Sequence, residues 1–177
     1  MSHAIRRFRP GDAEAMTAFA RGLPEHDLLF LSRDVREPRV VEAWLAAMEA
    51  GEIDSVIAED DGAIVATAAL VRDPLSWSAH VGEVRLLVAP DRRGAGLGSD
   101  LLQSLFMIAR ERGLTKLMAR MTVDQTGSIA LFEGVGFRAE AMLRNQVRGT
   151  DGQDHDLAIL SYDAGRVAAL HAATGIE

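Results

Sequence analysis

The chain has 177 residues, 48% hydrophobic and 25% charged, which is enough to build one domain with a full core. Its net charge of −7 argues against general nucleic-acid binding, and the absence of cysteine excludes disulfide frameworks, thiolate nucleophiles and cysteine metal sites. No run approaches the roughly 20 apolar residues of a membrane span, and the N-terminus shows no signal-peptide pattern. We therefore expect a cytoplasmic protein with no membrane association and no metal.

The first part of the chain carries both strand and helix patterns. Hydrophobic alternation predicts a first strand, which a Pro-Gly pair ends. Apolar residues at helical spacing then predict two helices, one after Asp12 as its N-cap and one beginning near Pro38. An Asp-Gly turn between two apolar runs predicts a hairpin. The predicted ranges are 4–9, 53–58 and 63–71 for the strands, and 13–21 and 38–50 for the helices.

The second part continues in the same manner. The predicted strands cover 79–88, 114–121, a segment from 138 to 147, and 155–162, and the predicted helices cover 99–112 and 128–135. Together the elements predict an α/β (α+β) fold, with a mixed central sheet of six to seven strands flanked by about four helices. We expect one domain over residues 1–163 and a helical tail over residues 164–177.

The stretch 84–99 predicts an anion site. An apolar strand ends at Pro90, two arginines follow, and three alternating glycines lead into a helix. Glycines let several N–H groups approach one ligand, and the helix dipole favours negative charge at the same place. Arg92 and Arg93 add formal positive charge to a chain that is acidic overall. We expect this stretch to hold a phosphate or pyrophosphate.

Two common phosphate loops do not fit this stretch. A Walker A loop needs a lysine after its last glycine, and a dinucleotide fingerprint needs a third glycine where Ser99 stands, which disfavours a nicotinamide-dependent dehydrogenase. The pattern Val88-x-Pro90 followed by Arg93-x-x-Gly96-x-Gly98 instead resembles the acetyl-coenzyme A (acetyl-CoA) loop of the GCN5-related N-acetyltransferase (GNAT) family.

A second motif at residues 124–137 strengthens the resemblance. It is similar to the family's pantetheine-side helix, with Gln125 at the usual asparagine, Ser128 at the small residue and Phe132 at the usual tyrosine. The likeness covers nearly the whole chain and implies the GNAT fold and acetyl-CoA as cofactor. The cofactor-binding residues it implies are Leu86, Leu87, Val88, Arg92, Arg93, Gly94, Ala95, Gly96, Leu97, Gly98, Ser99, Gln125, Ser128 and Phe132. In the family the strand before the loop splays from its neighbour, so the amide of Leu87 or Val88 is expected to face the thioester carbonyl.

The resemblance also implies a catalytic base. An acceptor amine arrives as an ammonium ion and must lose a proton, and Glu83 stands where many family members carry a glutamate base. His80, or His155 with Asp156, are the alternatives. The family's usual general acid is a tyrosine, but Phe132 carries no proton to donate and Tyr162 is a poor match, so the general acid stays unassigned.

The acceptor is not identified by the sequence. The segment 23–37 is expected to border its site, with Glu25 and Asp27 for a cation and Arg33 and Arg36 for a carboxylate or phosphate. The apolar cluster at 28–31 fits core packing better than an acceptor contact.

The leading hypothesis is an N-acetyltransferase that moves an acetyl group from acetyl-CoA to a primary amine of a small molecule, by direct attack through a tetrahedral intermediate. A protein lysine or N-terminal acetyltransferase is one alternative. The other, motivated by Phe132, is a non-catalytic acyl-CoA sensor. The resemblance further implies a homodimer.

Overall fold

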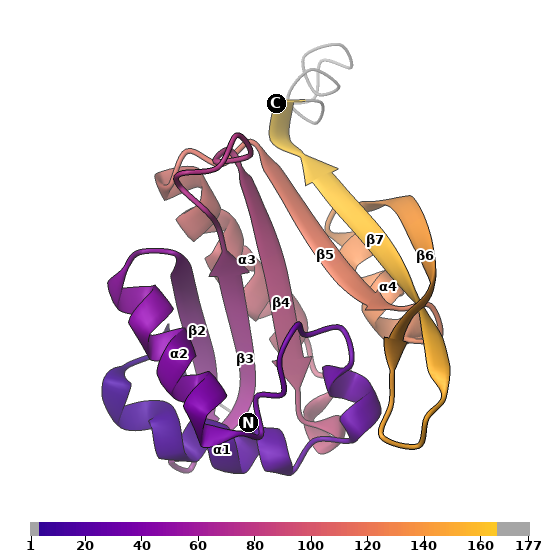
Figure 1. The fold of residues 1–177 in the computed structure, drawn as a ribbon. Helices are drawn as coiled ribbons and strands as arrows, with labels where there is room; N and C mark the ends of the chain where they lie inside the picture. Colours follow the sequence, from indigo (N-terminus) through magenta and orange to yellow (C-terminus); the bar gives the residue numbers. More distant parts are fainter. Residues whose placement is uncertain (1–3, 166–177) are drawn as a thin grey trace.

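The computed structural model describes residues 4–165, which form one mixed sheet with helices on both of its faces (Figure 1). The strands are β1 (Ala4–Arg7), β2 (Ile53–Asp60), β3 (Ala63–Val71), β4 (Val81–Val88), β5 (Lys116–Thr122), β6 (Arg138–Arg148) and β7 (Asp154–Asp163). The α-helices are α1 (Ala13–Arg21), α2 (Pro38–Glu49), α3 (Leu97–Glu111) and α4 (Thr126–Gly134), and short 3₁₀ helices are η1 (Pro10–Asp12), η2 (Glu25–Leu28) and η3 (Pro90–Arg92). The predicted mixed sheet with about four helices is confirmed.

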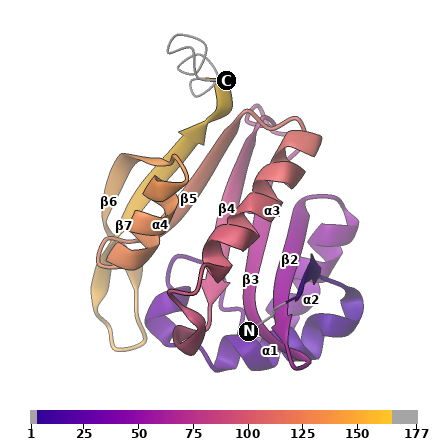
Figure 2. The same cartoon turned by 180° about the vertical axis from the view of Figure 1, so that it is seen from behind.

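The seven strands of the described chain lie in the order β1-β2-β3-β4-β5-β7-β6. Neighbouring strands are antiparallel except β4 and β5, which are parallel. A parallel pair needs a crossover connection, and here α3 supplies it on the back of the sheet (Figure 2). This crossover places the glycine loop at the end of β4.

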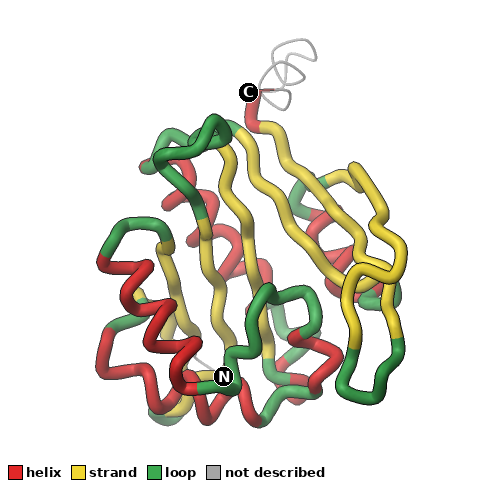
Figure 3. The backbone as a smooth tube through the Cα atoms, in the orientation of Figure 1, coloured by secondary structure: helices red, strands yellow, loops and turns green. Residues whose placement is uncertain are grey.

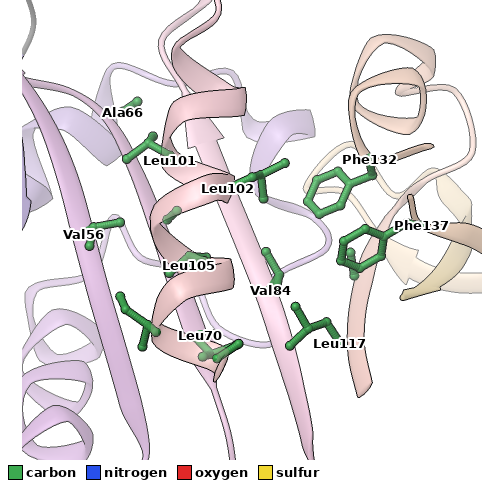
Figure 4. Packing of buried hydrophobic residues seen from close by; sticks show 14 of the residues in the cluster. Val56, Ala66, Leu70, Val84, Leu101, Leu102, Leu105, Leu117, Phe132 and Phe137 are labelled. Atoms are coloured by element: carbon green, nitrogen blue, oxygen red, sulfur yellow. The ribbon is translucent and has the colours of Figure 1, made fainter. Parts of the chain in front are cut away.

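Two apolar cores lie on opposite faces of the sheet. On the back, the buried face of α3 packs on β2, β3 and β4, with Leu101, Leu102 and Leu105 almost fully buried (Figure 4). The i, i+1, i+4 spacing of these leucines gives the helix one apolar stripe. On the front, α1 and α2 cover the β1–β3 side and bury residues such as Met16 and Val41 (Figure 1).

The centre of the sheet opens where β4 and β5 separate. Their pairing covers only Val81–Val84 of β4 and Lys116–Ala119 of β5. Beyond these residues the two strands diverge, as the yellow tubes of Figure 3 show. The last four residues of β4 therefore have a strand neighbour on the β3 side alone.

Several boundaries differ from the predicted ones. The helix predicted from residue 99 begins at Leu97, because Gly96 already adopts the left-handed conformation that ends the loop. The helix predicted from 128 begins at Thr126, and the first strand ends at Arg7 rather than residue 9. The predicted helical tail 164–177 lies outside the described residues apart from its first two, so it stays a prediction.

Candidate functional site

A cavity of about 820 Å³ fills the gap between the diverging strands. Its walls come from the end of β4, the glycine loop, the first turn of α3, the end of β5, α4 and η2. All residues predicted to bind the cofactor line it, with the exception of Ala95. The motifs at residues 84–99 and 124–137, which a helix and a strand separate in the chain, thus meet at one cavity.

The glycine loop has the conformation that an anion cradle needs. Gly94 and Gly96 have positive φ angles of 76° and 85°, which other residues rarely adopt, and no atom lies within 4 Å of where a Cβ would be. Gly96 is the N-cap of α3, so the unpaired N–H groups of the helix N-terminus follow it directly. The loop therefore leaves open space at a helix N-terminus, which suits the pyrophosphate of coenzyme A.

The two arginines of the loop hold it in place. Arg93 donates to the carbonyl of Val88 at 3.1 Å and to the carboxylate of Asp27 at 2.5 Å, and so connects β4, the loop and η2. Arg92 binds the carboxylate of Asp60 at the end of β2. Both side chains have a structural role while lining the cavity.

The amide direction on β4 follows from its pairing with β3. The N–H of Ala89 donates to the carbonyl of Val65 at 2.9 Å, and N–H groups alternate in direction along an antiparallel strand. The N–H of Leu87 therefore points to β3, whereas those of Leu86 and Val88 point into the gap. Of the two amides predicted to face the thioester, the geometry favours Val88 and adds Leu86.

On the opposite wall, α4 contributes a polar entrance and an apolar end. The side-chain oxygen of Gln125 accepts the N–H of Thr122 at 3.2 Å, which fixes the turn between β5 and α4. Phe132 is buried and packs edge-to-face on Phe137 with ring centroids 5.0 Å apart. Tyr162 packs on Phe106 and Phe137 and is not among the residues that line the cavity.

Glu83 lies one side chain away from the cavity. Its carboxylate accepts hydrogen bonds from Arg85 at 2.9 Å and from Arg120 at 2.9 Å, and Arg120 itself lines the cavity. Burial alone raises the pKa of Glu83, but the two guanidinium groups outweigh it and hold the pKa below its ordinary value. Sequence reasoning missed Arg120, because nothing near it in the chain distinguishes it from an ordinary charged strand residue.

A second polar cluster lies at the end of β5. His26 Nε2 is 3.0 Å from the carboxylate of Asp124 and 3.1 Å from the hydroxyl of Thr122, and its ring contacts His155 edge-on at 5.0 Å. The ligand-capable atoms of His26, Asp124 and His155 lie within 4.8 Å of one another. The hydrogen bond from Thr122 and the contact with His26 keep the pKa of Asp124 low. His26 and Asp124 line the cavity. The sequence did not indicate a role for His26, because its contact with Asp124 joins residues that are 98 positions apart.

The other predicted alternatives lie elsewhere. His80 is exposed in the loop before β4, where its carbonyl accepts the N–H groups of Thr115 and Lys116. The carboxylate of Asp156 accepts the N–H of Asn145 on the neighbouring strand. Neither residue lines the cavity.

The segment 23–37 crosses the front of the sheet, and several of its charged groups bind one another or the rest of the chain. Glu25 accepts hydrogen bonds from the amide and hydroxyl of Thr150 and from Arg36, and Asp27 is paired with Arg93. Leu28 and Phe30 are buried in the front core, as the core-packing prediction expected.

The model of the acetyltransferase (GNAT) family matches residues 21–137. The chain belongs to this family. A [ribosomal protein bS18]-alanine N-acetyltransferase of Escherichia coli is 33% identical over 69 residues, which are 39% of this chain and 47% of that protein. N-acetyltransferase 8 of Rattus norvegicus is 32% identical over 84 residues, 46% of this chain and 38% of that protein. The chain thus matches less than half the length of these curated GNAT relatives.

The fold of this chain also matches that of solved GNAT structures. A phosphinothricin acetyltransferase from Sinorhizobium meliloti, solved in complex with acetyl-CoA, aligns with a TM-score of 0.76 at 21% identity, over 92% of this chain and 89% of that chain. The family assignment confirms the resemblance found in the sequence, with acetyl-CoA as the acetyl donor of the family. Among residues 4–165, no helix combines the length and apolar character that a membrane crossing requires.

Proposed function

We propose that the protein is an acetyl-CoA-dependent N-acetyltransferase that acts on a primary amine of a small molecule. The observation that carries this proposal is the cavity of about 820 Å³ that contacts both the glycine loop and α4 at the point where β4 and β5 separate. Acetyl-CoA supplies the acetyl group as a thioester when it is bound. The chain's own residues must then hold the pyrophosphate, orient the carbonyl and accept a proton from the amine.

The first two tasks have clear candidates. The open N-terminus of α3 behind Gly94 and Gly96 suits the pyrophosphate, and the splayed half of β4 presents the amides of Leu86 and Val88 to the gap. A backbone N–H fixed toward a carbonyl oxygen stabilises the negative charge that develops there during attack. Because β3 holds β4 from the other side, these amides are oriented before the reaction begins.

Two groups are candidates for the proton acceptor. Glu83 is the one the resemblance implies, and its position beside Arg120 requires a water between it and the amine. Its lowered pKa makes it a weak base. His26 lines the cavity itself and is oriented by Asp124, an arrangement typical of a histidine base. Glu83 is the primary proposal, and His26 is the second.

The leaving sulfur has no proton donor at the usual position. Phe132 has no hydroxyl, and Tyr162 is held in the aromatic cluster with Phe106. We infer that coenzyme A leaves as the thiolate and takes its proton from solvent, which the ordinary thiol pKa of about 8.5 permits.

A small acceptor is supported by η2, which lies across the front of the gap (Figure 1) and is tied to the glycine loop, to β5 and to the β6–β7 turn. A protein substrate, as the name of the E. coli relative states for that enzyme, needs an open face. A homodimer, which rests on the resemblance alone, and a cytoplasmic location, which rests on the sequence pattern, are part of the proposal.

Release of free thiol from acetyl-CoA tests the proposal, with a panel of small amines and peptides and with calorimetric binding of acetyl-CoA as a parallel measurement. We expect turnover with small amines, and for Glu83→Gln a loss of kcat of about 100-fold or more with unchanged acetyl-CoA affinity. Glu42→Gln, an exposed change on α2, is the matched control.

The pH profile separates the two bases. Glu83 as the base gives an acidic limb below the ordinary glutamate range, because Arg85 and Arg120 hold the pKa of its carboxylate down, so a limb near neutral pH would speak against Glu83. A fast Glu83→Gln enzyme together with a slow His26→Gln enzyme would transfer the role to His26. Binding of acetyl-CoA without thiol release from any acceptor would favour the sensor alternative, and no binding at all would refute the proposed function.

A further inference from the structure

A second cavity of about 530 Å³ lies on the front of the sheet, between α2 and the strands. One wall is the apolar side of α2, with Val40, Trp44 and Ala47. Arg33 and Arg85 contribute positive charge, and Glu52 is the acidic residue among those that line it. The cavity therefore combines an apolar wall with guanidinium groups, which suits a small amphipathic molecule.

Arg85 connects this cavity to the first one. It projects from the front of β4 and donates from Nε to the carboxylate of Glu83 at 2.9 Å. Nη2 of Arg120 donates to both oxygens of the same carboxylate, and Arg120 lines the first cavity. The three side chains thus form a continuous cluster from the second cavity to the gap where the thioester is expected.

The charges of this cluster do not balance. Two guanidinium groups share one carboxylate, so the cluster carries one excess positive charge. Within residues 4–165, Arg85 uses only Nε in hydrogen bonding, while its two terminal nitrogens bind no protein group. Its side chain is 21% exposed, so these nitrogens are partly shielded from solvent. Paired terminal nitrogens of arginine are the geometry that binds a carboxylate with two hydrogen bonds.

We propose that the second cavity is the acceptor site and that it selects amines carrying a carboxylate, such as an α-amino acid with an apolar side chain. The carboxylate binds the terminal nitrogens of Arg85, the apolar side chain lies against α2, and the amine faces Glu83 and the gap. This inference rests on the proposed function and names its substrate class.

The reaction balances with these groups. The acceptor ammonium loses one proton to the base, its nitrogen forms a bond to the carbonyl carbon, and the bond from that carbon to sulfur breaks. The second proton of the nitrogen goes to solvent, and the sulfur leaves with the electron pair of the broken bond. The product is an N-acetylated amino acid, whose carboxylate keeps its charge.

Paired substrates test the inference. Initial rates are compared for leucine and leucinamide, and for methionine and methioninamide, which differ in the carboxylate. We expect kcat/KM for the acid to exceed that for the amide by at least tenfold, because the charged carboxylate accepts two hydrogen bonds from Arg85 and the neutral amide, with one acceptor oxygen, does not. Arg85→Met is expected to abolish this preference through the KM of the acid, and Arg85→Lys to recover part of it.

Two further variants keep the test independent of the Glu83 contact. Ala47→Leu fills the second cavity from the α2 wall without changing charge, and it is expected to raise the acceptor KM at unchanged acetyl-CoA affinity. Arg39→Met removes an exposed guanidinium of the same helix, and we expect it to leave the acceptor KM and the acetyl-CoA affinity as in the wild type.

Three results would overturn the inference. The first is an equal kcat/KM for each acid and its amide. The second is an Arg85→Met variant that lowers kcat/KM equally for acid and amide, and the third is an Ala47→Leu enzyme with an unchanged acceptor KM. The proposed function would survive each of them, since thiol release from other amines is scored separately. Failure to bind acetyl-CoA, in contrast, would refute the function itself.

Discussion

Gly98 lies at a close contact between α3 and α4, the two helices that line the first cavity. It lies in the first turn of α3, and a Cβ atom there would be 2.8 Å from Cδ2 of Leu131 on α4. Its backbone angles are ordinary, so glycine is needed for space and not for conformation. The atom that would be displaced is the end of a flexible leucine, which limits the cost.

We predict that Gly98→Ala lowers the free energy of unfolding by about 1 kcal/mol and weakens acetyl-CoA binding, because α4 must shift away from the loop. Urea unfolding and calorimetry measure the two effects. Gly127→Ala on α4 is the control, since no atom lies within 4 Å of its added methyl group, and it is expected to keep or raise the stability. Wild-type stability and affinity for Gly98→Ala would show that the two helices have room between them.

The short 3₁₀ helix η2 makes side-chain hydrogen bonds with three distant parts of the chain. Asp27 binds Arg93 of the glycine loop, His26 binds Asp124 after β5, and Glu25 binds Thr150 in the β6–β7 turn. The Glu25–Thr150 contact joins residues 125 positions apart. These polar links act together with the burial of Leu28 in the front core, so η2 is held over the gap by both kinds of contact.

Glu25→Gln tests this dependence. The amide and hydroxyl of Thr150 hold the pKa of Glu25 below its ordinary value, so the native contact is made to the charged carboxylate. We predict that the neutral variant exposes the Thr150 amide more often, as measured by faster hydrogen exchange, because a neutral side-chain oxygen accepts a weaker hydrogen bond than a carboxylate. Glu37→Gln, in the same segment and exposed, is expected to change nothing. Unchanged exchange at Thr150 in Glu25→Gln would mean that η2 is held by its other contacts.

The elements themselves were largely predictable, and the contacts of η2 were not. Helical spacing and glycine or proline signals lie within a few residues of one another, so α2 and the loop 84–99 were located from local sequence. The pair formed by His26 and Asp124 depends on how β1, α1 and β5 are placed relative to one another. The same holds for Arg120 and Glu83, which come from neighbouring strands that are 37 residues apart in the chain. No local pattern carries that information.

The divergence of β4 and β5 is a second feature that local sequence does not predict. The sequence of β4 is an uninterrupted strand pattern, and pairing over only Val81–Val84 cannot be derived from it. The resemblance to the family supplied that expectation, and with it the choice between Leu87 and Val88. Only the observed register with β3 decides between the two amides.

Asp54 joins three parts of the molecule that are distant in the chain, namely β1, β2 and the end of α3. Its side chain is 6% exposed on β2 and accepts hydrogen bonds from Arg7 of β1 at 3.0 Å and from Arg112 at the end of α3 at 2.8 Å, with Arg72 nearby at 4.0 Å. Burial alone raises the pKa of Asp54, but the bonds from Arg112 and Arg7 outweigh it and hold the pKa below its ordinary value of 3.8. Removal of the Asp54 carboxylate would leave the guanidinium groups of Arg7, Arg72 and Arg112 close together without the negative charge between them.

We predict that Asp54→Asn lowers the free energy of unfolding at pH 7 by about 2 kcal/mol, a value reduced from that of a fully buried pair because Arg7 and Arg112 reach solvent. Thermal unfolding should show a decrease of roughly 5 °C for a domain of this size. Asp61→Asn is the matched control, since Asp61 is exposed, has no ion pair in the described chain, and its φ of 49° is tolerated by asparagine.

The effect of Asp54→Asn must also depend on pH with a definite sign. A carboxylate whose pKa is lower in the folded state stabilises the fold above its unfolded pKa, and this stabilisation disappears as pH falls through the folded value. The difference between wild type and Asp54→Asn should therefore be constant from pH 7 to about pH 5 and shrink below pH 3.8. Unfolding in urea at several pH values measures it. A difference that persists below the folded pKa would assign the loss to altered packing around residue 54, because the protonated wild type and the variant then carry the same charge.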